Sequence, residues 1–389
     1  MTSQLGIPRG AAIAINDMLD NCAKMKPGDN VLILSELEDL YNKDWAVDET
    51  AVAWIQQAVM MKGGNASILW IDEPPTAHKW RFSPVVKGAM QGCDILINHS
   101  LNLVTEEMAE FRMYINEYKI KMVRNFASTA PLLCSYWAQT PHELVSEIRH
   151  QASRLFKDGL PYTLTDENGT HLEGFIEGGR GRPYDTAITP YVSTREEVGF
   201  YLPWPEWVHP PVNVKGTNGV FIFDCMLSWW SRYIGISPYF DHPIKITVEN
   251  NRMVKIEGDK EAEALKRFLT DMANRIGDTV WNFPVFHHGV HPQAVVGLQQ
   301  CPNINLRRTI EHSHSSNLHF HIGQSFTTKE STYPYWYHCT GDIRQPTLKV
   351  GDTYSMIKGH LTALDHPDVK AVAEKYPGRP GVEPAPASF

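Results

Sequence analysis

Short apolar, β-branched stretches alternate with longer helical patterns through the first 155 or so residues, and this alternation constrains the fold more than any other feature. The apolar stretches lie at residues 31–34, 66–71, 94–97 and 121–126, and the helical patterns at 48–61, 105–118 and 141–156. Strands this short, separated by helices of this length, are typical of a parallel sheet with helices on both faces. We therefore predict an N-terminal doubly wound α/β domain over residues 1–158.

Sheets of this kind often bind nucleotides, but no G-x-G-x-x-G or G-x-x-x-x-G-K-[ST] motif follows any of the strands. A dinucleotide site and a P-loop are therefore rejected. Active-site groups can still come from the ends of the strands, where α/β folds place their ligands. His99 follows the strand at 94–98 and is the candidate catalytic residue of this domain.

From Tyr162 onward the pattern changes to strands and tight turns, with hairpin signals at 166–169 and 250–251 and an amphipathic helix at 259–276. We predict a C-terminal, β-rich α+β domain over residues 159–376, which carries the metal site, and a flexible tail over 377–389 that is rich in Pro, Gly and Ala. Two features suggest substrate contacts. Arg180 and Arg182, in a glycine-rich loop, could clamp a carboxylate, and Trp204 could stack on a planar ring.

Charge and cysteine usage exclude several classes of protein. The net charge of −8 argues against nucleic acid as a partner, because binding phosphate requires a basic surface. The six cysteines are scattered without a C-x-x-C pair, which fits a reducing compartment. No apolar run approaches the ~20 residues of a membrane span, and no signal peptide pattern begins the chain. We expect a cytoplasmic protein that forms homo-oligomers.

Eight histidines fall between His287 and His338, in the segments FHHGVHP, IEHSHSSNLHFHIG and YHCTGDI. Imidazole is the commonest side-chain ligand for first-row metals, so histidines at this density predict a metal site. A strand at 317–323 would direct Leu318, Phe320 and Ile322 to one face and His319 and His321 to the other.

Two histidines and a carboxylate on one side of a metal leave positions open for substrate and dioxygen, which is the arrangement of non-haem Fe(II) oxygenases. His338 and Asp342 supply an imidazole and a carboxylate close in sequence. A zinc or two-metal hydrolase uses the same residue types, so ligand type alone leaves both classes open.

Several segments resemble the thermophilic leucyl aminopeptidase superfamily and, within it, the branch of dihydroxypyridine ring-opening dioxygenases. The segments occur in the family's order: KPGDNVLIL, GFYLPWPE, GVFIFD, PIKITVENNRMVKIEGD, HHGVHPQA, SNLHFHIG and HCTGDI. The aminopeptidase branch implies a two-metal hydrolase. The dioxygenase branch implies a single Fe(II) held by two histidines and a final aspartate.

The resemblance implies that His287, His338 and Asp342 are the metal ligands. The family has one residue between its second and third ligands and this chain has three, so a bulge at Gly341 would be needed to bring the Asp342 carboxylate back.

Three other residues could serve as ligands. His288 or His291 could replace His287, because this chain is two residues shorter than the family before Pro292, and Glu311 would be a ligand in a hydrolase.

The remaining histidines are candidates for proton transfer. His319 or His321 would take the proton of a substrate hydroxyl, which suits a group with a pKa near 7, and His99 is the nearest substitute for the family's base histidine.

The first hypothesis is therefore a mononuclear Fe(II) dioxygenase that uses O2 to open the ring of a small hydroxylated aromatic or N-heteroaromatic compound. The second is a zinc or two-metal aminopeptidase or amidase. The third is a non-catalytic binding protein whose histidines take up metal without a function.

Overall fold

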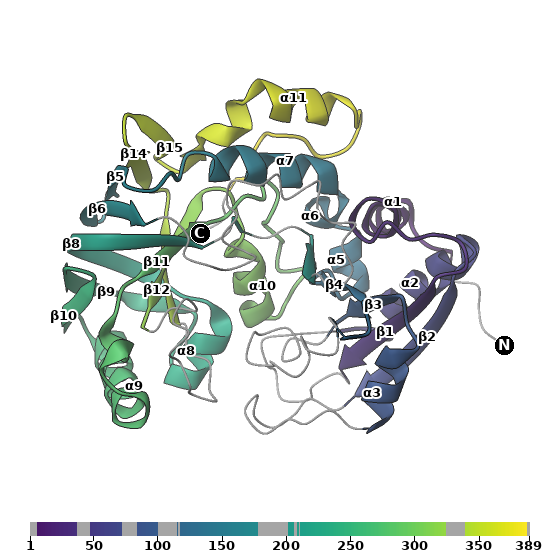
Figure 1. Ribbon diagram of the computed structural model, residues 1–389, viewed down its shortest axis with the longest axis horizontal. Coiled ribbons are helices and arrows are strands. Elements are labelled where there is room, and N and C mark those ends of the chain that lie inside the picture. The colour runs from purple at the N-terminus through teal and green to yellow at the C-terminus, as the bar shows by residue number, and fades with distance from the viewer. Residues whose placement is uncertain are drawn as a thin grey trace.

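The structure is a computed structural model that describes residues 6–36, 47–71, 84–99, 115, 117–177, 201–205, 208–209, 211–323 and 339–386. It contains two sheets, which lie on opposite sides of the molecule in Figure 1. The predicted residues Arg180, Arg182 and His338, and most of the helix predicted at 105–118, lie outside the described residues.

The first sheet is parallel throughout, as the sequence predicts. Its strands run in the order β2, β1, β3, β4, β7, with bounds Asn65–Ile71, Asn30–Glu36, Ile95–Asn98, Lys121–Asn125 and Tyr201–Trp204. Adjacent strands pair in register, for example Ile33 with Ile97 and Ile97 with Val123.

Helices cover both faces of this sheet. Successive residues of a strand point to opposite faces, so one strand contributes side chains to the core on each side. Val31 and Ile33 of β1 share a core with α1 (Arg9–Asp17) and α2 (Glu49–Met61), whereas Leu32 and Leu34 pack with α3 (Pro84–Gln91). Asp48 caps α2 by accepting a hydrogen bond from the Ala51 amide. The doubly wound α/β prediction is confirmed.

The second sheet is antiparallel and accounts for the β-rich half of the chain. Its described strands are β5 (Pro161–Thr165), β6 (His171–Glu177), β8 (Val212–Cys225), β9 (Tyr239–Glu249), β10 (Arg252–Glu257), β11 (Val285–His288), β12 (Asn317–Ile322), β13 (Cys339–Arg344), β14 (Thr347–Val350), β15 (Thr353–Ile357) and β16 (His360–Leu361). Both predicted hairpins form, between β5 and β6 and between β9 and β10. Asn250 and Asn251 in the second turn have φ of 46° and 63°, the left-handed values that this kind of two-residue turn requires.

Within this sheet, four strands pair with one another in a closed ring. β11 pairs with β12, β12 with β13, and both β11 and β13 pair with β8. Their inward apolar side chains form an aromatic core, in which Phe283 stacks on Phe320 with centroids 4.4 Å apart and Phe286 and Phe221 lie 5.4 and 5.5 Å from the same ring. Strands β11 to β13 are therefore held rigidly from one side.

This half of the chain also contains the helices α8 (Ser228–Ile234) and α9 (Lys260–Ile276) and the 3-10 turns η3 (Asp278–Trp281) and η4 (Thr362–Asp365). Helix α10 (Ile304–Glu311) lies in the middle of the molecule in Figure 1, and most of its residues are buried. The helices α5 (Ala130–Leu133), α6 (Tyr136–Gln139) and α7 (His142–Ser153) follow β4.

The two halves are more interleaved than the predicted boundary at residue 158 implies. Strand β7, which the sequence assigns to the C-terminal half, pairs in parallel with β4, with Val123 opposite Leu202 and Asn125 opposite Trp204. The chain therefore enters the antiparallel sheet, returns to complete the parallel one, and goes back.

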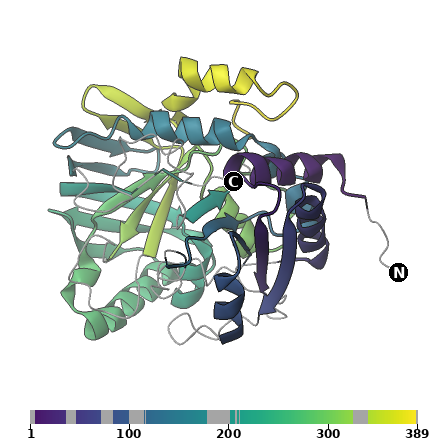
Figure 2. The ribbon, with the colours of Figure 1, turned by 45° about the vertical axis from the view of Figure 1, so that its right-hand side comes forward.

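The C-terminal segment also joins the halves. Helix α11 (Pro367–Glu374) lies beside α7 along the top of Figures 1 and 2, and beyond it Arg379 donates to Asp17 and to the Gln139 carbonyl. Further on, the Ala385 amide donates to the Pro292 carbonyl at 2.8 Å. The described part of the predicted flexible tail, residues 377–386, is thus hydrogen-bonded to both halves.

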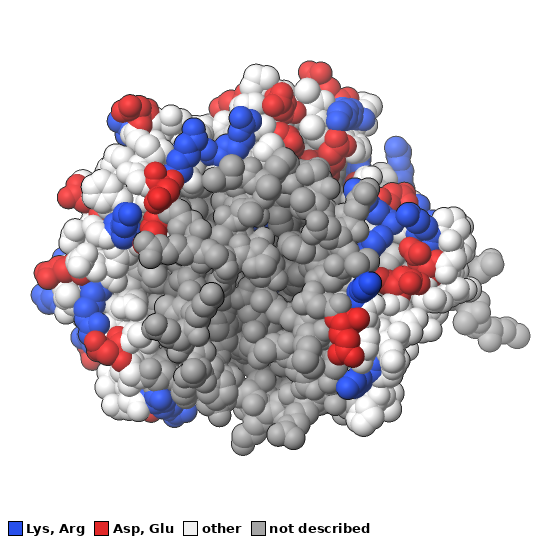
Figure 3. All heavy atoms as spheres, in the orientation of Figure 1, with Lys and Arg blue, Asp and Glu red and all other residues white. Residues whose placement is uncertain are grey.

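Over the described part of the chain, no helix is both long and apolar enough to cross a bilayer. On the face shown in Figure 3, the described acidic and basic side chains are interspersed around the rim rather than gathered by sign.

Candidate metal centre

Three histidines meet on neighbouring strands of the antiparallel sheet. His287 on β11 lies directly opposite His319 on β12, and His321 follows two residues later on the same face of β12. Phe286 and Phe320 alternate with them and pack into the aromatic core behind. The predicted division of β12 into an apolar and a histidine face is confirmed.

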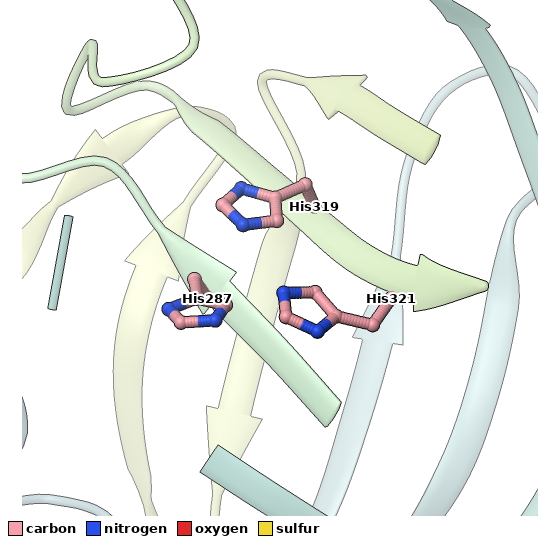
Figure 4. A group of neighbouring side chains, drawn as sticks. All are labelled: His287, His319 and His321. Atoms are coloured by element: carbon pink, nitrogen blue, oxygen red, sulfur yellow. The ribbon is translucent and has the colours of Figure 1, made fainter. Parts of the chain in front are cut away.

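The three imidazoles are close enough to share one ion. The ring centroid of His287 lies 4.8 Å from that of His319 and 4.8 Å from that of His321, and one nitrogen from each ring falls within 4.8 Å of the other two. Figure 4 shows the rings gathered in one space, His287 from one strand and the other two from its neighbour.

A backbone contact fixes the orientation of His287. Its Nδ1 lies 2.8 Å from the carbonyl oxygen of His209, so Nδ1 carries the proton and donates it. Nε2 is then the nitrogen with a lone pair. Metal-binding histidines usually donate their other ring N–H to a carbonyl or carboxylate in this way.

Glycine 289 lets β11 run close to the loop that precedes β12. A Cβ at Gly289 would lie 2.1 Å from the carbonyl oxygen of His314, so no other residue fits without moving the backbone. The close approach is part of what brings β11 and β12 into this register.

Burial keeps the imidazoles of His287 and His319 neutral. His287, His319 and His321 are 7%, 3% and 2% exposed. Desolvation lowers the pKa of His287 to about 3, assisted by the nearby His312, and lowers the pKa of His319 well below its usual value. Neutral imidazole is the form that binds a metal, so near pH 7 these two rings need no deprotonation to do so.

An unsatisfied atom supports a bound ion. Nδ1 of His319 is buried and finds no hydrogen-bond partner among the residues that the structure describes. A buried polar atom left unpaired costs about 1–3 kcal/mol, and native proteins rarely tolerate one without a reason. A metal ion bound by the three imidazoles supplies that reason, and the donor set fits a first-row divalent ion.

A second group shares His319 with the first. His312, His319 and Asp342 also offer ligand atoms within 4.8 Å of one another, and the His312 and His319 rings lie 3.9 Å apart. Oδ2 of Asp342 accepts hydrogen bonds from Arg308 and, at 2.5 Å, from Nδ1 of His312, whereas Oδ1 is buried and finds no hydrogen-bond partner among the described residues.

The buried arginine makes this second group less suited to a cation than the first. Burial would raise the pKa of the Asp342 carboxyl, but His312 and Arg308 hold it below its usual value. The carboxylate is therefore charged, and its charge is compensated by Arg308, which is 1% exposed. We read Asp342 as a group that orients His312.

The predicted bulge at Gly341 is absent. Strand β13 pairs with β12 without a register shift, and Asp342 lies opposite His319 on the histidine face. Gly341 lies on the other face, where a Cβ would come within 2.8 Å of Phe221 and Phe223.

The alternative ligands lie elsewhere. His288 points to the opposite face of β11, where its Nδ1 meets the Gly289 carbonyl and its Nε2 lies 3.3 Å from the Ser355 hydroxyl. Glu311 accepts a hydrogen bond from the Tyr239 hydroxyl.

The ring centroid of His291 lies 6.4 Å from that of Trp137, and the backbone of His291 forms an isolated β-bridge with His314. Neither group of candidate ligands in the described chain includes His288, His291 or Glu311.

His99 lies at the end of β3 in the parallel sheet, between the ends of β1 and β4. The Asn125 side-chain amide donates to Nε2 at 2.7 Å, while the oxygen of that amide accepts from Ala127. Nε2 is thus an acceptor, and Nδ1 carries the proton and donates to the Ser35 hydroxyl at 3.1 Å. Both nitrogens of His99 are thus engaged in hydrogen bonds, the residue is 0% exposed, and burial lowers its pKa to about 3.

Trp204 is 1% exposed at the end of β7 and belongs to the hydrophobic core. No face of its ring is open to a substrate in this conformation.

The sequence did not reveal three residues that complete the centre: His209, Arg308 and His312. His209 forms hydrogen bonds with two consecutive residues of β11. Its backbone carbonyl accepts a hydrogen bond from the His287 side chain, and its side-chain Nε2 accepts one from the His288 amide at 2.8 Å. It lies in an isolated H-P-P segment without a metal motif. His312 belongs to the histidine-rich stretch, but only the fold separates it from its neighbours.

A five-stranded parallel sheet joined to a separate antiparallel sheet that carries the buried histidines defines an aminopeptidase-like fold. Two solved structures share it. The 2,5-dihydroxypyridine dioxygenase of Pseudomonas putida KT2440 is 11% identical, with a TM-score of 0.59, and the match covers 92% of this chain and 98% of that one. The aminopeptidase AmpT of Thermus thermophilus is also 11% identical, with a TM-score of 0.50, covering 92% of this chain and 100% of that one.

No protein-family profile and no curated protein sequence matches the chain. The comparisons therefore establish the fold, which is the fold implied by the sequence resemblance.

Proposed function

We propose that this protein is a mononuclear Fe(II)-dependent dioxygenase that opens the ring of a small hydroxylated aromatic or N-heteroaromatic compound. His287, His319 and His321 are the residues that would hold the iron. The observation that carries the proposal is the convergence of three buried imidazoles from two paired strands, with one nitrogen of His319 lacking a described partner.

The composition of this cluster supports a single-metal centre over a two-metal hydrolase. Hydrolases with two metals hold their ions about 3.5–4 Å apart and need carboxylates to bind and bridge them. Of the two candidate ligand groups in the described chain, one contains no carboxylate and the other contains only Asp342, which is paired with Arg308.

When bound, iron supplies the one-electron chemistry that joins an electron-rich ring to dioxygen, which protein side chains lack. The chain's own residues bind, orient and exclude water. The His209 carbonyl fixes the tautomer of His287, the aromatic core behind β11 and β12 prevents the strands from moving, and burial of all three rings removes bulk water.

The experiment that tests this proposal is metal analysis of protein purified without oxygen, followed by oxygen-uptake assays with hydroxypyridines and dihydroxybenzoates. We expect one iron per chain and turnover that stops under strictly anaerobic conditions. Zinc as the bound metal, together with peptide or amide hydrolysis that persists without oxygen, would support the hydrolase hypothesis instead. The hydrolase is the alternative tested because the aminopeptidase AmpT has the same fold as this chain.

A further inference from the structure

We propose that His321, as a neutral third ligand, makes this centre select substrates that chelate through two adjacent oxygen atoms and bind as dianions, such as an aromatic ring with neighbouring hydroxyl and carboxylate groups. This inference rests on the proposed function and names the substrate class of the same site.

The first step is the charge of the ligand set. Three neutral imidazoles leave both positive charges of a divalent ion uncompensated, whereas two histidines and a carboxylate leave only one. The family resemblance implies a carboxylate, that of Asp342, as the third ligand, whereas the cluster on β11 and β12 contains three histidines and no carboxylate.

The second step is that the described residues around the cluster do not restore the missing negative charge. The carboxylate next to the cluster, Asp342, is compensated by the buried Arg308 and by its hydrogen bond from His312. The Glu311 carboxyl is engaged in a hydrogen bond from the Tyr239 hydroxyl. Opposite His321, across the β12–β13 pair, lies the uncharged Thr340.

The third step is energetic. An uncompensated charge in a buried site is costly, because the interior solvates ions far less well than water. A ligand that brings two negative charges neutralises the centre, and three protein ligands leave coordination positions free for a chelate. If the third ligand were a carboxylate, a substrate with a single negative charge would neutralise the centre.

The test uses two isomeric probes and a ligand swap. Metal-free protein is loaded anaerobically with Co(II), and its visible spectrum is followed during titration with salicylate, which chelates, and with 4-hydroxybenzoate, which cannot. We expect salicylate to bind at least ~10-fold more tightly, a difference of about 1.4 kcal/mol, and to change the Co(II) spectrum.

His321→Asp, which restores a carboxylate, should retain Co(II) while reducing the preference for salicylate at least ~10-fold. His321→Asn, a neutral ligand of similar size to aspartate, is the matched control and should keep the preference.

The outcomes separate the two proposals. Failure of the wild-type protein to bind Co(II) would overturn the metal centre and this inference with it. Co(II) binding with equal affinity for the two isomers, or the same preference in His321→Asp as in wild type, would overturn the substrate class alone.

Discussion

His99 and His319 are both buried imidazoles at the ends or faces of sheet strands, yet the protein treats them differently. His99, in the parallel sheet, has both ring nitrogens satisfied, by Asn125 and Ser35. His319, in the antiparallel sheet, has the rings of His287, His312 and His321 within 6 Å and leaves Nδ1 without a partner among the described residues. Completeness of hydrogen bonding, and not burial, therefore distinguishes the structural histidine from the candidate ligand.

The largest expected effect concerns the ion pair beside the cluster. Asp342→Asn leaves Arg308 charged and buried without its counter-ion, so we expect the free energy of unfolding to fall by about 3–5 kcal/mol. Chemical denaturation of the metal-free protein measures this change. The double variant Asp342→Asn with Arg308→Met should recover part of the loss, and no recovery would mean that Arg308 is not the reason for the instability.

The contrast between the two histidines is tested directly by matched substitutions. His319→Ala should weaken metal affinity by at least ~100-fold, because the loss of a direct ligand costs more affinity than the loss of a group that only orients a ligand. His99→Ala should leave the metal affinity unchanged. His99→Ala should instead lower stability by about 1–3 kcal/mol, because Ser35 and Asn125 lose their partner. Equilibrium dialysis and denaturation provide the two readouts, and equal metal affinity in both variants would remove the distinction.

The smallest effect is on the pH dependence of stability. The folded-state pKa of His99 is about 3 and its ordinary value is 6.5, so the unfolded chain binds a proton between these values that the folded chain does not. Stability is then full above about pH 6.5 and falls as pH decreases, by about 1.4 kcal/mol per pH unit from this group. His288 and His314, with pKa values of about 4, act in the same direction.

His99→Gln removes one of these groups and should make the acid limb shallower by about that amount, measured from denaturation midpoints between pH 6 and 4. An unchanged slope would show that His99 is protonated in the folded protein.

Much of the fold could be predicted from local patterns. Short β-branched strands between capped helices identified the parallel sheet, and asparagine-rich turns identified the hairpins, because turn chemistry and strand alternation are local properties. Strand β7 was misassigned, since its partner β4 lies far away in sequence and nothing within residues 201–204 specifies pairing.

The site shows the same limit. Alternation placed His319 and His321 on one face of β12, but the position of His287 opposite them depends on the register of two strands. The sequence suggested Asp342 as a ligand because a carboxylate near a histidine fits iron. Its partner Arg308 lies on a separate helix, α10, and only the folded structure shows that this carboxylate forms a buried ion pair.

The central claim is that three histidines from two strands hold one ion. Pulsed EPR of the Cu(II)-loaded protein counts imidazole nitrogens at the metal directly, in wild type and in the single variants His287→Ala, His319→Ala, His321→Ala and Asp342→Asn. We predict three imidazoles in the wild-type signal, one fewer in each histidine variant, and no change in Asp342→Asn. A signal that the histidine substitutions leave intact, or that only the aspartate substitution alters, would contradict the account.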